Sequence, residues 1–377
     1  MSRKKIIPVM LCIMLLLMGA GTAGSTLKEE VHSAARGLQM SLEGKNEMIL
    51  NRQEILPAGS SQSDWAAIAL ALAGEKDHYR AYAKELEDYV KDTYARKGSL
   101  SDRKVTEYDR VILTVLALGK DPENFGGENL LEDGIWNYQG GSPGDQGVNG
   151  WIYSLIAMDA GNYEAPADAQ YTRPLVIEQI LSEQNEDGSF GLQKGSADPD
   201  LTAMAVQALA PYQTEAKVSE GTEKALQWLS ENMTEQGSYV SYGEESAESC
   251  AQTVIALCAL GIDPAEDERF EKNGVTLLDG IELFARSSGG YAHTSSDQES
   301  NFMASEQVLL AKVALLRMRQ GEERLYSFTQ YTGPEESGTA LMQIVPVIVV
   351  AVFLAGIVLV FRRKGKTNAK IDRTDSK

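Results

Sequence analysis

Six short and almost wholly apolar segments recur along the chain, one about every fifty residues. Five of them end at Gly or Pro. A helix that is apolar on every face is a buried helix, and a Gly just past its last turn supplies a left-handed cap. We therefore predict six inner helices. They cover residues 64–74, 109–119, 151–161, 201–211, 251–261 and 306–316.

More polar segments alternate with the apolar ones, and each has one face suited to water. They are predicted as outer helices over residues 27–42, 78–94, 128–138, 172–184, 218–233 and 272–286. A stack of helix pairs that curls until its first and last repeats meet has no exposed end to cap. The pattern thus predicts an all-α protein over residues 27–328. Its expected fold is an α6/α6 toroid, a double ring of six inner and six outer helices.

The N-terminal residues have the three-part layout of a secretory signal peptide. Arg3, Lys4 and Lys5 precede an apolar stretch, which small residues follow. That order is typical of a leader that is removed on export. We expect residues 1–23 to be this signal peptide.

The C-terminal residues predict a single membrane anchor. Residues 340–361 are apolar apart from Gln343 and long enough to cross a bilayer. A basic tail, residues 362–377, follows, and such cations stay on the cytoplasmic side. We expect a short linker over residues 329–339, a toroid outside the cell and the lipid bilayer as a partner. The expected location is therefore the cell membrane, with a single pass.

Charge and cysteine content narrow the classes of function. The formal net charge is -19, and an acidic surface repels the phosphates of nucleic acid. Cys250 and Cys258 lie too far apart along one helix for a disulfide. Stability must therefore come from a large buried core. Phosphate-binding loops and metalloprotease helices are absent from the sequence, and we expect no cofactor.

One loop motif follows the fourth outer segment. Residues 184–191 read Gln-Asn-Glu-Asp-Gly-Ser-Phe-Gly, and weaker versions lead to Tyr239 and Tyr291. The motif resembles the glutamine-tryptophan repeat of the squalene cyclase and protein prenyltransferase superfamily, with Phe190 in the aromatic place. The resemblance implies the α/α toroid, in agreement with the helix pattern. Physically, Gln184 and the aromatic residue brace an outer helix against an inner one.

A possible acid motif opens the fourth inner helix. Residues 198–203 read Asp-Pro-Asp-Leu-Thr-Ala, which resembles the Asp-x-Asp-Asp-Thr-Ala of class II terpene cyclases. The resemblance implies that Asp200 is a general acid and Asp198 its partner, although Leu201 replaces the last Asp. Either carboxylate could instead cap the helix by accepting a backbone N–H. We favour the capping interpretation.

A possible zinc pair precedes the fifth inner helix. Glu248-Ser249-Cys250 resembles the Asp-x-Cys pair of protein prenyltransferases. His293 falls in a loop before the sixth inner helix and is a poor third ligand for a tetrahedral site. Cysteine as a small buried hydrophobe is the commoner explanation. We therefore expect no metal.

Polar residues open all the inner helices and should gather at one end of the ring. They are Asp64, Asp109, Asn149, Asp200, Glu248 and Glu306. Because five of the six are acids, we predict a carboxylate-rimmed pocket suited to a polar or cationic group. Trp151 is expected to add an aromatic surface to it.

Three functions follow from these features. The favoured one is a non-catalytic, membrane-anchored module that binds a small molecule, peptide or glycan at the cell surface. The second is a terpene-cyclase-like enzyme with Asp200 as its acid. The third, cleavage of a glycan by paired carboxylates, has only an analogy of fold behind it.

Overall fold

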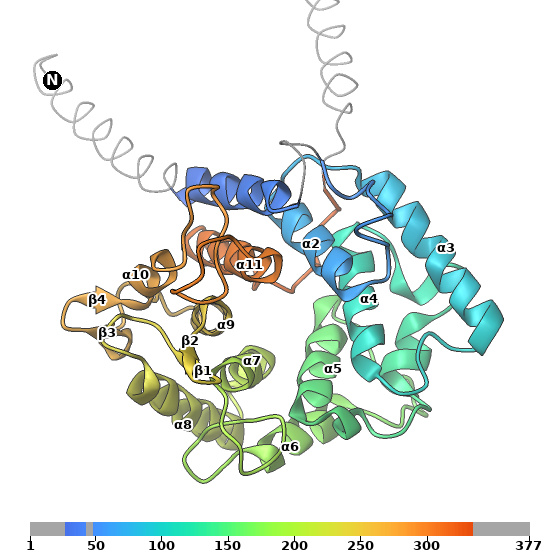
Figure 1. Cartoon of the computed structure of the whole chain (residues 1–377). Coiled ribbons are helices and arrows are strands. Elements are labelled where there is room, and N and C mark those ends of the chain that lie inside the picture. Colours follow the sequence, from blue (N-terminus) through green and yellow to red (C-terminus); the bar gives the residue numbers. More distant parts are fainter. Residues whose placement is uncertain (1–26, 43–47, 335–377) are drawn as a thin grey trace, which may run out of the picture. The chain divides into compact units, whose positions relative to one another are not determined.

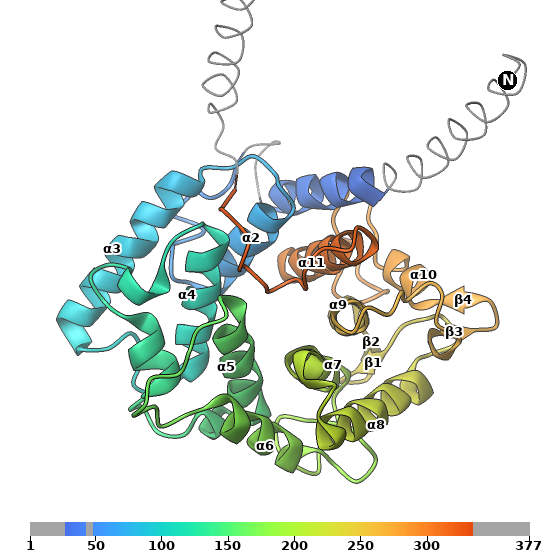
Figure 2. The ribbon, with the colours of Figure 1, turned by 180° about the vertical axis from the view of Figure 1, so that it is seen from behind.

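The computed structural model describes residues 27–42 and 48–334, and most of them are helical. At the centre, six apolar helices form a closed ring (Figures 1 and 2). Each packs against the next along the chain, and the last packs against the first. They are α2 (Ser61–Leu72), α4 (Val105–Ala117), α5 (Val148–Ala160), α7 (Pro199–Leu209), α9 (Ala247–Ala259) and α11 (Phe302–Arg319). The predicted helical, toroid-like fold is confirmed.

The inner helices begin a few residues before the apolar runs from which they were predicted. Polar side chains at the N-caps explain the extra turn: those of Ser60, Ser246 and Asn301 each accept a backbone N–H of the first turn. The first turns are therefore polar, although they are part of the ring. This places residues such as Glu107 on an inner helix, upstream of the apolar run.

A second layer of helices surrounds the ring. Its members are the helix over residues 27–40, α3 (Tyr79–Lys97), the π-helix η3 (Glu132–Trp136), α6 (Arg173–Glu183), α8 (Ala216–Asn232) and α10 (Leu277–Glu282). The helix predicted over residues 272–286 is wrong in its first part. There, β3 (Glu271–Lys272) and β4 (Val275–Thr276) form a hairpin. Asn273 and Gly274 both have positive φ, the requirement of a tight hairpin turn.

Short elements connect the two layers. One is a second hairpin of β1 (Val240–Ser241) and β2 (Glu244–Glu245). The others are the 3-10 turns η2 (Pro122–Asn124), η4 (Pro143–Gln146), η5 (Ala210–Tyr212) and η6 (Glu268–Phe270).

The predicted brace between outer and inner helices is present after α6. Gln184 Nε2 donates to the carbonyl oxygens of Gly188, at 2.9 Å, and Gly221, at 2.8 Å. Phe190 is buried. Gly188 has a φ of 93°, which a residue with a side chain rarely adopts. The motif is therefore structural.

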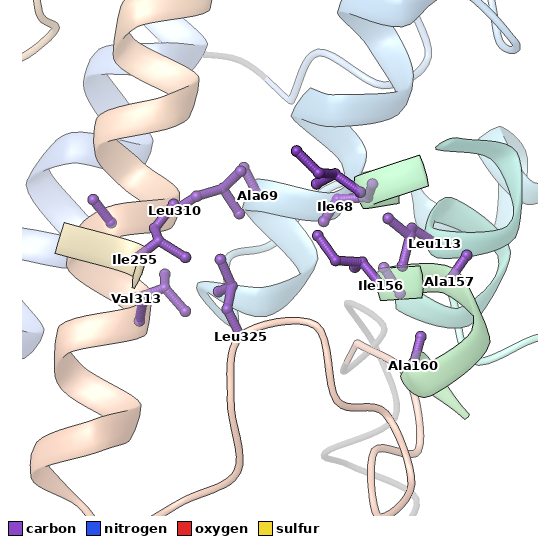
Figure 3. Close-up of a cluster of buried hydrophobic side chains, with 14 of the residues drawn as sticks. Ile68, Ala69, Leu113, Ile156, Ala157, Ala160, Ile255, Leu310, Val313 and Leu325 are labelled. Atoms are coloured by element: carbon purple, nitrogen blue, oxygen red, sulfur yellow. The ribbon is translucent and has the colours of Figure 1, made fainter. Parts of the chain in front are cut away.

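The ring is filled with side chains toward the end where the inner helices finish. Figure 3 shows Ile68, Leu113, Ile156 and Ile255 converging there from four different helices. Leu325 joins them from the segment that follows α11.

That following segment continues across the same end of the ring. The Phe328 amide donates to the carbonyl of Ala160, at 2.8 Å, and the Tyr331 hydroxyl to the carbonyl of Ala71, at 3.2 Å. Both acceptors lie at the C-terminal ends of inner helices. The segment therefore lies across this end of the ring.

Residues predicted to meet the membrane lie mostly outside the described part of the chain. This holds for the signal peptide over 1–23, the spanning segment over 340–361 and the tail over 362–377. Within residues 27–42 and 48–334, no helix is both long and apolar enough to cross a bilayer.

Candidate active site

A cavity of about 620 Å³ opens where the inner helices begin. All six contribute to its wall, through residues in their N-terminal halves. Its polar lining consists mainly of Ser61, Gln62, Lys104, Thr106, Glu107, Arg110, Gln146, Asn149, Gln252, Glu306 and Gln307. A concave site with converging polar groups is the usual form of a small-molecule site. This cavity is therefore the candidate active site.

Aromatic rings form the deeper part of the wall. Trp65 meets Tyr153 edge to face, with ring centroids 5.6 Å apart, and Tyr326 at 6.2 Å. All three line the cavity. Tyr326 comes from the segment that lies across the far end of the ring, so that segment also contributes to the site. Such rings offer apolar faces beside polar edges.

Glu306, on α11, is the acid that the sequence placed correctly in this cavity. The residue is 5% exposed, and its carboxyl group accepts no hydrogen bond from any residue that the structure describes. Burial, followed by the nearby charge of Glu248, raises the pKa of Glu306 to about 8. The group therefore carries its proton at neutral pH and presents it to the cavity.

A second acid, Glu107, lines the same cavity from α4. Its carboxylate accepts from Arg110 Nη2 at 2.6 Å, and its side chain is 30% exposed. The cavity thus holds two carboxyl groups in different environments: Glu306 is buried without a hydrogen-bond partner among the described residues, and Glu107 forms an ion pair with Arg110.

Asp198 and Asp200 have different roles at the start of α7. Asp198 Oδ1 accepts from the Leu201 amide at 3.0 Å, so Asp198 is the cap. Asp200 accepts from the Ser249 hydroxyl on α9. Burial, opposed by that hydrogen bond, raises the pKa of Asp200 to about 6. Neither aspartate belongs to the cavity wall.

Glu248 is held beside the cavity rather than in its wall. Both of its carboxylate oxygens lie 2.9 Å from Nδ1 of His293. This hydrogen bond raises the pKa of His293. The neighbouring Cys250 is fully buried, and burial raises the pKa of its thiol, which disfavours the thiolate that zinc needs. Glu248 therefore acts on the site through its charge, which favours the protonated form of Glu306.

Asp64 and Asp109 are buried between helices. Asp64 accepts from Arg110 Nε at 2.9 Å, from the Tyr82 hydroxyl at 2.6 Å and from the Gly59 amide at 3.0 Å. It fixes Arg110, which in turn pairs with Glu107. Asp109 accepts a long hydrogen bond from Ser154, at 3.4 Å, and its Oδ2 has no partner among the described residues. Burial raises the pKa of Asp109 well above the ordinary value.

Trp151 lies away from the cavity. Its ring meets that of Tyr171 edge to face at 5.8 Å, and its indole contacts the position of Gly144. It packs α5 against neighbouring loops. Of the residues predicted to form the pocket, Glu306 and Asn149 line the cavity, and the other five do not reach its wall, a count that includes Trp151 but not Asp198.

Sequence reasoning missed Glu107, Gln307 and Tyr326. Glu107 was overlooked because α4 begins before its apolar run, and Tyr326 because it follows the last helix. A helical projection from Val105 would have placed Glu107 and Arg110 on the face that α4 turns to the ring.

Comparison with known proteins gives no match in sequence: neither a family model nor a curated protein matches the chain. Comparison of structures does give matches. The fold resembles that of unsaturated glucuronyl hydrolase. One such enzyme, from Bacillus sp. GL1 and responsible for the degradation of glycosaminoglycan, is 14% identical, with a TM-score of 0.52. The match covers 80% of this chain and all of the other.

A second structure is of a variant of this type of enzyme with dGlcA-Glc-Rha-Glc. It is 13% identical with a TM-score of 0.50, and the match covers 80% of this chain and 99% of the other. Identities this low show a shared fold and nothing finer.

Two predictions from the sequence are overturned by these neighbours. The matching structures are glucuronyl hydrolases, a different toroid family from the squalene cyclases and prenyltransferases. The loop motif indicated the wrong family because its role is to hold outer helices against inner ones, and any toroid of this kind requires such contacts. The expected non-catalytic binding module is wrong as well, because the proteins that share the fold are hydrolases. The cyclase-like alternative, with Asp200 as its acid, depended on the resemblance to squalene cyclases and is therefore not supported either.

Proposed function

We propose that the chain is a glycoside hydrolase-like enzyme that cleaves a carbohydrate in the central cavity, with Glu306 as general acid and Glu107 as general base. One observation carries the proposal: two carboxyl groups line one cavity, Glu306 buried with a raised pKa and Glu107 in an ion pair with Arg110. A buried carboxyl group with a raised pKa is suited to act as a general acid. Most glycoside hydrolases use such an acid together with a second carboxylate.

The reaction balances with these two groups and one water. Glu306 gives its proton to the glycosidic oxygen as the bond from that oxygen to the anomeric carbon breaks. Water adds to the anomeric carbon, and Glu107 accepts the proton that the water loses. Arg110 holds the carboxylate of Glu107 in position, and Asp64 holds Arg110 in place.

The rest of the wall suits a sugar. The rings of Trp65, Tyr153 and Tyr326 offer surfaces for the apolar faces of pyranose rings. Amide side chains around them match hydroxyl groups. The structural neighbours add support, since both are glucuronyl hydrolases and one was determined with an oligosaccharide.

Location and architecture complete the proposal. We propose that the enzyme is exported and anchored by residues 340–361, with the linker over 329–339 and the tail over 362–377. The described helices support an α6/α6 toroid in which η3 stands for one outer helix. A substrate outside the cell would then reach the open mouth of the ring.

The test is turnover of defined oligosaccharides by the purified full-length chain. A panel of dGlcA-Glc-Rha-Glc, chondroitin disaccharide, cellotetraose and chitotetraose is incubated at pH 6.5, and products are identified by mass spectrometry. We expect cleavage of at least one, and a loss of about a hundredfold or more in Glu306→Gln and in Glu107→Gln. Asp198→Asn, which keeps the helix cap outside the cavity, should match the wild type. A substrate that both glutamine variants cleave at the wild-type rate would overturn the assignment.

A further inference from the structure

Three glutamines on neighbouring inner helices form a chain of hydrogen bonds. Gln207, on α7, donates from Nε2 to the backbone oxygen of Gln252 at 3.0 Å and to its Oε1 at 2.8 Å. Gln252, on α9, donates from Nε2 to Oε1 of Gln307 on α11, at 2.9 Å. Gln207 and Gln252 are 7% and 3% exposed. The chain therefore runs through the wall of the ring.

A backbone oxygen fixes the direction of this chain. A carbonyl oxygen only accepts hydrogen bonds, so the atom of Gln207 that meets it has to be the nitrogen. The same nitrogen then requires the oxygen of the Gln252 side chain beside it. Gln252 must consequently turn its nitrogen to Gln307, and Gln307 its oxygen to Gln252. None of the three amides can reverse without placing two donors or two acceptors together.

The chain ends in the cavity. Both Gln252 and Gln307 line it, while Gln207 lies deeper. With its oxygen engaged, Gln307 turns its NH₂ group away from Gln252, and no acceptor for that group exists among residues 27–42 and 48–334. Two unsatisfied donors in a half-buried position are costly unless a ligand or water accepts from them. Glu306, the preceding residue, also presents a proton to this space.

We infer that Gln307 is a specificity-determining residue, fixed by the glutamine chain so that it selects ligands with an acceptor-only oxygen, a carboxylate or a carbonyl, and rejects an ammonium group. The inference rests on the proposed carbohydrate-binding cavity. It predicts that the direction of the hydrogen bonds among the three glutamines, and not only the presence of an amide at Gln307, controls which ligand group is bound.

At a pH above the pKa of the new acid, where the titrations are run, Gln252→Glu reverses the last hydrogen bond of this series. A carboxylate at position 252 still accepts a hydrogen bond from Gln207. It also presents an oxygen to Gln307, so Gln307 has to donate to it from its nitrogen. Gln307 then turns its oxygen to the cavity. The matched control is Gln62→Glu, which adds the same charge to the same cavity from α2 without touching the chain.

Calorimetric titration of the full-length chain with two probes measures the effect. The probes are dGlcA-Glc-Rha-Glc, which carries a carboxylate, and the fully deacetylated glucosamine tetramer, which carries ammonium groups. We expect the wild type to prefer the acidic probe. In Gln252→Glu, the ratio of the two affinities should move toward the amine by roughly tenfold beyond its shift in Gln62→Glu, the scale of one exchanged hydrogen bond. Equal shifts in the two variants would overturn the inference.

Side-chain amide NMR separates this inference from the proposed function. The NH₂ signals of Gln307 are assigned by their loss in Gln307→Met. In the wild type, without ligand, they should exchange with solvent faster than those of Gln252, and in Gln252→Glu they should become protected. Gln307 protons that are protected in the wild type would overturn the inference even if a sugar binds. If neither probe binds but the exchange pattern is as expected, the carbohydrate proposal fails and the orientation of Gln307 stands.

Discussion

Glu107 and Glu306 face one cavity from the two helices that flank α2, and of the two only Glu107 is paired with an arginine. Burial without a neighbouring cation favours the protonated form of Glu306. The ring therefore places two glutamates in different environments around one ligand site.

Replacing Glu306 by glutamine should change how stability depends on pH. The pKa of Glu306 is about 8 in the folded chain against an ordinary value of 4.5. Between these values the folded state binds the proton and the unfolded state releases it, so the wild type loses stability as pH rises through this window. Glu306→Gln should lack this loss. Thermal melts of both proteins at pH 5 and pH 8 measure it, and an equal change in both would show that Glu306 is ionised when folded.

The cap of α7 can be tested with two substitutions at one position. Asp198→Ala removes the acceptor for the Leu201 amide and should cost about 1 kcal/mol of unfolding free energy. Asp198→Asn should leave stability within a few tenths, because Asn caps about as well as Asp. Urea denaturation of the three proteins decides. Similar losses in both variants would mean that the charge of Asp198, rather than its cap, matters.

Removing Arg110 should be far more harmful than breaking a surface ion pair. Arg110→Met leaves Asp64 buried without its cation, so the acid must take up a proton or remain uncompensated, and loss of one partner of a buried pair costs about 3–5 kcal/mol. Arg319→Met is the control, since its side chain is 39% exposed beside Asp263, and it should cost at most about 1 kcal/mol. Equal effects in urea denaturation would contradict the central role of the Asp64–Arg110 pair.

Lys312 should hold the first and last outer helices together. This buried lysine donates to Glu30, in the helix over residues 27–40, at 3.0 Å and to Glu282, in α10, at 2.9 Å. In Lys312→Met both carboxylates return to water, and we expect a loss of about 1–3 kcal/mol. Hydrogen exchange should rise in residues 27–40 and remain unchanged in α5, on another part of the ring. An equal rise in both would indicate general destabilisation.

The sequence specified the ring well and the site poorly, for physical reasons. A fully buried helix needs apolar side chains on every face, so apolar runs indicate buried helices and the inner ring could be predicted. The hairpin before α10 was missed although Asn273-Gly274 signals a turn. A pairing between helices, such as Arg110 with Asp64, joins residues whose separation in the sequence does not indicate contact. The resemblance to cyclases failed because the quoted motifs cap and brace helices, tasks shared by unrelated toroids.

The pH dependence of hydrolysis tests the central claim most directly. It is measured as kcat/KM of the full-length chain, on the best substrate of the oligosaccharide panel, from pH 5 to pH 10. If Glu306 is the general acid, the rate should hold below its pKa of about 8 and fall about tenfold per pH unit above it. Glu306→Gln should show only a small residual rate without this limb. A wild-type rate that stays constant up to pH 10, or a limb that persists in Glu306→Gln, would contradict the account.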